Sequence, residues 1–335
     1  MQSHDMQSIK FPGANQADKD LLASLHHLQR LLPKAHADTA NQLLDNLSNL
    51  EDGTLVAPIV YAWYREFTLE HLVEATEAGL VKIGIKRLGA GWPVWVNLSQ
   101  GEFSIVTPQH DTSPYTAEGW SLLLNEGSRG LLKIVSPTAE QLEQFSKKVE
   151  DALTLFKAIA TVQYQTWCDA IRMIVAVAQS ADSQISLAGG SSLFLPGVMV
   201  VNVDYCSDTL ETLATLVHEA AHVQLNSLCS HEPLCLNVAA ERFESPLRAD
   251  ARPMEGVIHA NYVCATLAEL FMQISQSRHC SESREQARKI AEDHYQPLAA
   301  QVDQIVEHAQ LTAAGQQTLS YMQSVIKNCG ELATP

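Results

Sequence analysis

Residues 207–228 read SDTLETLATLVHEAAHVQLNSL, and the rest of the chain can be interpreted outward from this stretch. Asp208 followed by Glu211 three residues later resembles the capping box that begins a helix. Leucines at 210, 213 and 216, together with Val217, recur at helical spacing and predict one buried face. The stretch therefore predicts a well-formed amphipathic helix.

The middle of this predicted helix carries a pair of histidines. His218 and His222 are separated by four positions, so both imidazoles project from one helix face and can reach one metal ion. Glu219 points to the side, where its carboxylate can act on a bound water or ligand. Two histidines on an apolar helix can also be hydrogen-bonded core residues, but a helix that follows a strand is the context expected for a metal site.

A stable metal site needs a third protein ligand. The longer motif with a following Gly and His is absent, because Leu225 and Leu228 occupy those places. The candidates lie downstream, at Glu255, His259 and Glu269. Since Glu255 and His259 are again four residues apart, either can face the metal. A glutamate would complete a His₂Glu zinc site, whereas His259 would give an all-nitrogen set.

Two further groups flank these candidates. His231 lies in the loop CSHEPLC at 229–235, which is either a separate metal knuckle of irregular spacing or an ordinary loop with thiols. Arg248 and Arg252 precede the segment that carries His259, and an arginine beside a metal can bind a carboxylate with its fork of donors. The alternative for both arginines is a surface or capping role.

The N-terminal half predicts helices and short strands. Helical patterns run from Asp18 to Pro33, over 38–50 and between Pro58 and Gly79. WPVWVNL, Ser-Gln-Gly and EFSIVT predict a strand, a turn and a strand, and residues 121–135 have the same form. These patterns favour a small antiparallel sheet.

The C-terminal half predicts mainly helices. The stretch 138–188 lacks Gly and Pro and predicts one amphipathic helix, or two with a break near 179–184. GGSSLFLPGVMVVNVD at 189–204 predicts a loop, a short strand, a Pro-Gly turn and a second strand. Helices are expected from Pro253 to about 275, over 281–308 and over 312–328.

We therefore expect a mainly helical α+β protein, in which a small antiparallel sheet lies beside a helical C-terminal unit that carries the HExxH metal helix. The expected domains are a helical region with the sheet at 1–136 and a metal-binding catalytic domain at 137–335. The metal would lie between the helix at 208–228 and the helix at 253–275.

Composition narrows the class of function. The 335 residues include 22 Lys and Arg against 38 Asp and Glu, a formal net charge of −16, which disfavours general binding of nucleic acid or anionic membranes. We expect no secretory signal and no membrane-spanning segment, since no basic start precedes an apolar run and no apolar stretch approaches about 18 residues. Seven sparse cysteines favour reduced thiols and a cytoplasmic location.

Three runs together are similar to a known family. LPGVMVV at 195–201, TLVHEAAH at 215–222 and SPLRADARPMEGVIHANYV at 245–263 resemble the HExxH-motif peptide-modification proteins, also described as 2-oxoglutarate-dependent HExxH-type peptide β-hydroxylases. The resemblance covers about residues 190–275. HExxH alone is shared with many peptidases, and its combination with Arg-Pro-x-x-Gly-x-x-His, from Arg252 to His259, makes the similarity specific.

The resemblance implies a mononuclear Fe(II) oxygenase with 2-oxoglutarate as co-substrate, acting on a β-carbon of a ribosomally made precursor peptide. It implies that His218, His222 and His259 are iron ligands, that Arg252 binds the distal carboxylate of 2-oxoglutarate, and that Glu219 positions groups. The usual iron triad has two histidines and a carboxylate, so Glu255 stays open as the third ligand.

Two other interpretations stay open at this stage. In the first, a Zn(II) metallopeptidase uses His218, His222 and a downstream glutamate as ligands, with Glu219 activating the water. In the second, a non-catalytic peptide-binding protein keeps a relic of the site. The sequence does not name the peptide, the modified residue or the oligomeric state.

Overall fold

The structure is a computed structural model that describes residues 18–24, 54–56, 95–97, 103–108, 120, 131–193, 195–245, 248–278 and 283–333. The helices expected at 38–50 and 58–79 lie outside the described residues. The chain divides into two compact units. One contains Gln144–Trp167 and Tyr205–Pro335 and is mainly helical, and the other contains Cys168–Asp204 with the described part of Pro12–Glu143 and holds the sheet.

The larger sheet has five strands in mixed orientation. Its strand order is β3-β5-β7-β6, with β3 and β7 parallel to β5, β6 antiparallel to β7, and β4 antiparallel to β5. The central strands read MIVAVAQ and VMVVN and are buried almost throughout, as is typical of strands covered on both faces. The bounds are β3 Ser104–Val106, β4 Ile134–Val135, β5 Met173–Gln179, β6 Gly189–Ser191 and β7 Val198–Asn202.

The predicted small antiparallel sheet is therefore wrong in its pairing. The expected hairpin of WPVWVNL with EFSIVT does not form: β2 (Trp95–Asn97) pairs antiparallel with β1 (Thr54–Val56), whereas β3 pairs parallel with β5. Local alternation indicates that a segment is a strand, but its partner is chosen by burial against segments distant in the sequence.

The expected helical stretch at 138–188 is also corrected. Helix α6 (Ala139–Ile159) and helix α7 (Thr161–Ala170) fill its first part, but β5 follows as a strand. A short continuous apolar run fits a buried strand as well as a buried helix, and the β-branched residues of β5 favoured the strand.

The strand predicted after the Pro-Gly turn is confirmed as β7, whereas the short strand before the turn is β6, which lies at the start of the run where a loop was expected. Gly197 closes the turn with a φ of +77°, which side chains disfavour. A Cβ at this position would lie 2.6 Å from Cγ of the buried Arg172. Arg172 is in turn fixed by an ion pair of 2.9 Å with Asp18.

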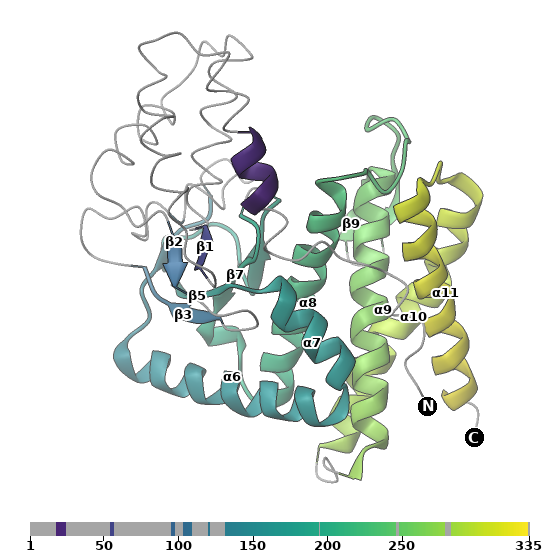
Figure 1. Ribbon diagram of the computed structural model, residues 1–335. Helices are drawn as coiled ribbons and strands as arrows, with labels where there is room; N and C mark the ends of the chain where they lie inside the picture. The colour runs from purple at the N-terminus through teal and green to yellow at the C-terminus, as the bar shows by residue number, and fades with distance from the viewer. Residues whose placement is uncertain are drawn as a thin grey trace, which may run out of the picture. The chain divides into compact units, whose positions relative to one another are not determined.

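The helical unit is built around a central helix (Figure 1). Helix α9 (Met254–Gln276) packs against α8 (Thr209–Cys229), α10 (Arg284–His308) and α11 (Ala313–Ala333). These four helices confirm the predictions for 208–228, 253–275, 281–308 and 312–328. Strands β8 (Phe243–Ser245) and β9 (Arg248–Arg252) form an antiparallel pair that leads into α9.

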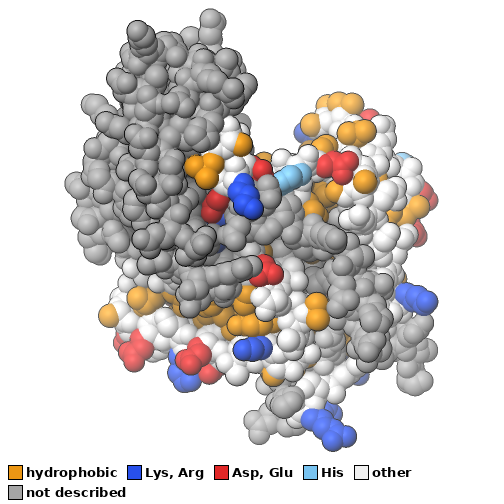
Figure 2. All heavy atoms as spheres, in the orientation of Figure 1, with side chains coloured by type: hydrophobic (Ala, Val, Ile, Leu, Met, Phe, Trp, Pro, Cys, Tyr) orange, Lys and Arg blue, Asp and Glu red, His pale blue; other side chains and the backbone are white. Residues whose placement is uncertain are grey.

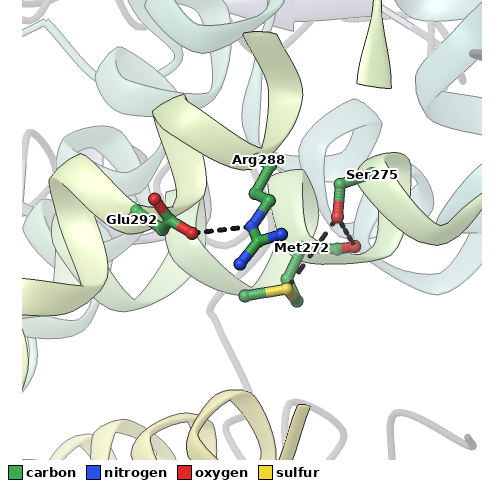
Figure 3. Close-up of polar contacts among 4 residues, drawn as sticks. All are labelled: Met272, Ser275, Arg288 and Glu292. Carbon is green, nitrogen blue, oxygen red and sulfur yellow. Dashed lines mark hydrogen bonds and ion pairs between the residues drawn. The ribbon is translucent and has the colours of Figure 1, made fainter. Parts of the chain in front are cut away.

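The ends of the two site-bearing helices have clear local causes. Asp208 caps α8, since its Oδ1 accepts hydrogen bonds from the backbone N–H groups of Leu210 and Glu211 at 2.9 and 3.0 Å, as the sequence predicted. At the end of α9, the Ser275 hydroxyl donates to the Met272 carbonyl at 2.7 Å (Figure 3).

By length and composition alone α9 is apolar enough to cross a membrane. However, 83% of its most apolar 18-residue window is buried inside the protein. The packing of α8, α10 and α11 around it accounts for that composition, since the central helix of a bundle is apolar on all sides.

Candidate metal centre

Helices α8 and α9 bring three imidazoles together. The ring centroids of His218 and His222 lie 5.1 Å apart on one face of α8, at an interplanar angle of 64°. His259 of α9 lies 5.9 Å from His222 between ring centroids, with the planes inclined by 20°. All three predicted histidine ligands thus lie at the α8–α9 contact.

The contact has an antiparallel register. Near the end of α8, Cys229 Sγ lies 3.7 Å from Nε2 of His259 in the second turn of α9. Five residues earlier on α8, Gln224 Oε1 accepts a hydrogen bond of 3.2 Å from the Tyr262 hydroxyl. The buried pair of Gln224 and Tyr262 holds the two helices in this register.

Desolvation favours the neutral form of the His218 and His259 imidazoles. Desolvation, followed by the nearby His222 and His294 imidazoles, lowers the pKa of His218 to about 3. Desolvation alone lowers the pKa of His259 to about 4. At neutral pH both rings therefore offer a lone pair rather than a charge, which is the form that binds a metal ion. Imidazole nitrogens are donors that divalent transition metals accept.

The site is accessible from solvent. The three imidazoles are half-buried rather than sealed in the core, so each keeps some surface that solvent can contact. Among the described residues on the face drawn in Figure 2, histidine side chains reach the surface near acidic and basic groups.

The structure adds His294 of α10 to this neighbourhood. Its Nδ1 donates a hydrogen bond of 2.7 Å to the Ile290 carbonyl. Its electrostatic interaction with His218 is one of the causes that lower the pKa of His218. Sequence reasoning missed His294, because no local spacing relates a residue on α10 to the HExxH pair.

A second set of donors adjoins the histidines. The ligand atoms of Cys229, Glu255 and His259 all lie within 4.8 Å of one another. Burial, followed by the charge of the Glu255 carboxylate and a hydrogen bond with it, raises the pKa of the Cys229 thiol to about 12. Cys229 follows His222 by seven residues, two helical turns, so helical spacing alone would have placed it on the same face.

The other predicted ligands have different surroundings. Glu269 lies ten residues after His259, about 15 Å further along the helix axis. Its Oε2 accepts hydrogen bonds from the Tyr321 hydroxyl at 2.9 Å and from the Gln163 amide at 2.5 Å. The Nδ1 of His231 lies 2.8 Å from the Ser230 hydroxyl. The Cys229 sulfur lies near the ligand atoms of Glu255 and His259 on α9, and His231 is not a member of that group.

Glu219 is buried, with 5% of its surface exposed, and lies on α8 directly after His218. His218 and His222 project from one face of α8, whereas Glu219 projects from a position about 100° around the helix axis from His218. This is the sideways placement that the sequence indicated, and its catalytic role stays a prediction.

Arg252 lies at the end of β9, beside the first turn of α9. A Cβ added to Gly256 would lie 3.5 Å from Arg252 Cβ and 3.6 Å from its Nε, so the arginine stem runs along this glycine. Its Nη1 lies 4.0 Å from the exposed Asp250 carboxylate, a long ion pair that contributes little. Arg248 lies opposite Ser245 in the β8–β9 pair, and its side chain lies outside the described residues.

Comparison of the sequence with protein-family models and with curated proteins found no match.

Proposed function

We propose that this protein is a non-haem Fe(II) and 2-oxoglutarate-dependent oxygenase that hydroxylates a β-carbon of a ribosomally made precursor peptide. The observation that carries the metal centre is the gathering of His218, His222 and His259 at one helix contact. The oxygenase class rests on the resemblance of the HExxH and Arg-Pro-x-x-Gly-x-x-His runs.

The spacing of the imidazoles supports a shared ion. With metal–nitrogen bonds of about 2.1 Å, two imidazoles bound at angles between right and tetrahedral have centroids about 4.5–5.2 Å apart. His218 and His222 fall within this range at 5.1 Å. His222 and His259 are wider at 5.9 Å and their ring planes differ by only 20°, so the proposal requires these two rings to move together and to rotate before their in-plane lone pairs meet at one ion.

When bound, iron with 2-oxoglutarate and dioxygen converts one carbon–hydrogen bond of a peptide to carbon–hydroxyl and releases succinate and carbon dioxide, which balances the atoms. The protein residues hold and orient the reactants. His218, His222 and His259 would hold the iron and would leave its other coordination positions for the co-substrate and dioxygen. Arg252 binds the distal carboxylate with its fork of donors, and Glu219 orients groups beside the metal.

A zinc metallopeptidase is the second candidate function. The observation in its favour is that the Glu255 carboxylate lies within 4.8 Å of the ligand atom of His259, so a glutamate is at hand as a ligand. In that case Glu219 would activate a water. Glu255 is exposed and grouped with Cys229 rather than with the histidine pair, which favours the oxygenase.

The test is succinate formation by the full chain supplied with Fe(II), 2-oxoglutarate and candidate peptides, followed by mass spectrometry of the peptide. We expect succinate and a peptide heavier by one oxygen, about 16 Da. Cleaved peptide, or turnover that is independent of 2-oxoglutarate, would overturn the proposal in favour of the peptidase.

Two arginine variants, one of them a control, test the role proposed for Arg252. Arg252→Gln removes the proposed carboxylate fork, and we expect the KM for 2-oxoglutarate to rise about 10–100-fold, as for loss of a charge-assisted hydrogen bond. Arg288→Gln is the control, because Arg288 binds Glu292 at 2.7 Å on the exposed face of α10 (Figure 3). Equal KM values for the two variants would remove Arg252 from the site.

A further inference from the structure

Cys229 and Glu255 have no part in the proposed oxygenase chemistry, yet the ligand atoms of both lie within 4.8 Å of the ligand atom of His259. We propose that Cys229, Glu255 and His259 form a second binding position for a divalent cation that accepts a thiolate ligand, zinc above all, and that filling it withdraws His259 from His218 and His222. The proposed zinc position depends on these three residues alone. Only the competition between zinc and iron for His259 rests on the proposed function.

The geometry of the group suits a tetrahedral ion. Zinc bonds of about 2.3 Å to sulfur and about 2.1 Å to nitrogen, at the tetrahedral angle, separate the two donor atoms by about 3.6 Å. Cys229 Sγ and His259 Nε2 lie 3.7 Å apart. With the Glu255 carboxylate inside the same 4.8 Å limit, small side-chain rotations bring all three donors to one ion.

The chemistry of the donors also suits zinc. A thiolate and a carboxylate together neutralise the charge of a divalent cation, and thiolate sulfur selects zinc over magnesium or calcium. The Cys229 sulfur accepts a hydrogen bond from the backbone N–H of Leu234, and its thiol donates to Glu255. Binding replaces the thiol proton, which leaves to solvent, and a water takes the fourth position.

His259 is the residue that the two positions share. Its Nε2 lies 3.7 Å from the Cys229 sulfur, and its ring centroid lies 5.9 Å from that of His222. Its ring is about 1 Å further from His222 than two ligands of one ion require, as estimated from bond lengths. Zinc bound at Cys229 and Glu255 would hold the His259 ring at this distance from His222, so filling the zinc position opposes a shared ion of the three histidines.

Cobalt(II) is the direct probe of the zinc position, because a cobalt–thiolate bond gives an intense near-ultraviolet charge-transfer band. Chelator-treated full-length protein should show this band on titration with Co(II). Cys229→Ala and His259→Ala should lose it, while Cys206→Ala, which removes another buried thiol of the same helical unit, should retain it. Far-ultraviolet circular dichroism checks that each variant is folded.

The histidine pair separates the two positions. The thiolate band should persist in His218→Ala and His222→Ala if Cys229 serves a position of its own. Loss of the band in these variants would overturn the inference, since Cys229 would then be a ligand of the histidine centre. Cobalt binding without any thiolate band would also overturn it, while leaving the histidine centre and the oxygenase proposal intact.

Glu255→Gln tests the third donor without disturbing the core, since Glu255 is exposed. We expect its zinc affinity, measured against a chromophoric chelator, to fall about 10-fold or more. Glu232→Gln, in the loop after α8, is the matched control for lost charge. Equal affinities in the two variants would exclude Glu255 from the position.

Competition is measured as zinc inhibition of Fe(II)-dependent succinate formation. We expect Cys229→Ala to raise the zinc concentration that halves turnover about 10-fold or more. An unchanged value would show that zinc displaces iron at the histidine pair directly and would overturn the competition. Absence of succinate formation in all proteins would count against the oxygenase, and the cobalt band would still decide the zinc position.

Discussion

His218 provides a quantitative test through the pH dependence of stability. In the unfolded chain its pKa is the ordinary 6.5, and in the folded protein burial and the neighbouring imidazoles lower it to about 3. Between these two pKa values, His218 is therefore protonated in the unfolded chain and neutral in the folded protein. The stability that His218 contributes is complete above pH 6.5 and is lost progressively as the pH falls toward 3.

The magnitude follows from the two pKa values. At pH 5 the imidazole is protonated in the unfolded chain and neutral in the folded protein. The free energy of unfolding therefore falls by about 1.4 kcal/mol for each pH unit below 6.5, which is about 2 kcal/mol by pH 5. His259, with a pKa of about 4, adds a loss of similar size over the same interval.

The assay is urea unfolding of the wild type and of His218→Gln at pH 7 and pH 5, with a chelator present so that metal binding does not contribute. The wild type should lose about 2 kcal/mol more than the variant between the two pH values. His308→Gln is the control, because the His308 side chain is 54% exposed at the end of α10. Equal losses in wild type and His218→Gln would refute the description of His218 as a buried, neutral ligand.

Three further predictions concern the site and its supports. Asp208→Ala removes the cap of α8 and should cost about 1 kcal/mol in urea unfolding, whereas an unchanged midpoint would contradict the capping bonds. Gly197→Ala forces a side chain into a positive φ and against Arg172, so we expect a loss of at least about 1 kcal/mol in thermal unfolding; equal stability would show that the turn relaxes. Glu219→Gln should weaken 2-oxoglutarate turnover without abolishing it, measured as succinate formed. If the wild type instead cleaves peptide and Glu219→Gln abolishes that cleavage, the result would favour the peptidase.

Local signals explain what the sequence predicted well. The helix α8, its cap at Asp208 and the shared face of His218 and His222 all follow from spacings of three and four residues. The start of α9 after Pro253 is likewise a local signal. His259 could be proposed as a ligand from the sequence because it lies in the first turns of that helix.

Non-local pairing explains the errors. The apolar residues of β5 fit a buried helix as well as a buried strand, and only their pairing with β3 and β7 decides between them. The contact of His259 with Cys229 depends on the antiparallel register of α8 and α9, which is set by packing and by the bond of Gln224 with Tyr262. The proximity of His294 depends on how α10 packs, which no spacing within one segment encodes.

The most direct test of the central claim is anomalous diffraction at the iron absorption edge from anaerobic crystals grown with Fe(II) and 2-oxoglutarate. The account predicts one anomalous peak about 2.1 Å from ring nitrogens of His218, His222 and His259, with the Arg252 guanidinium on the distal carboxylate of the co-substrate. Imidazoles that turn to separate partners, with no peak between α8 and α9, would contradict it.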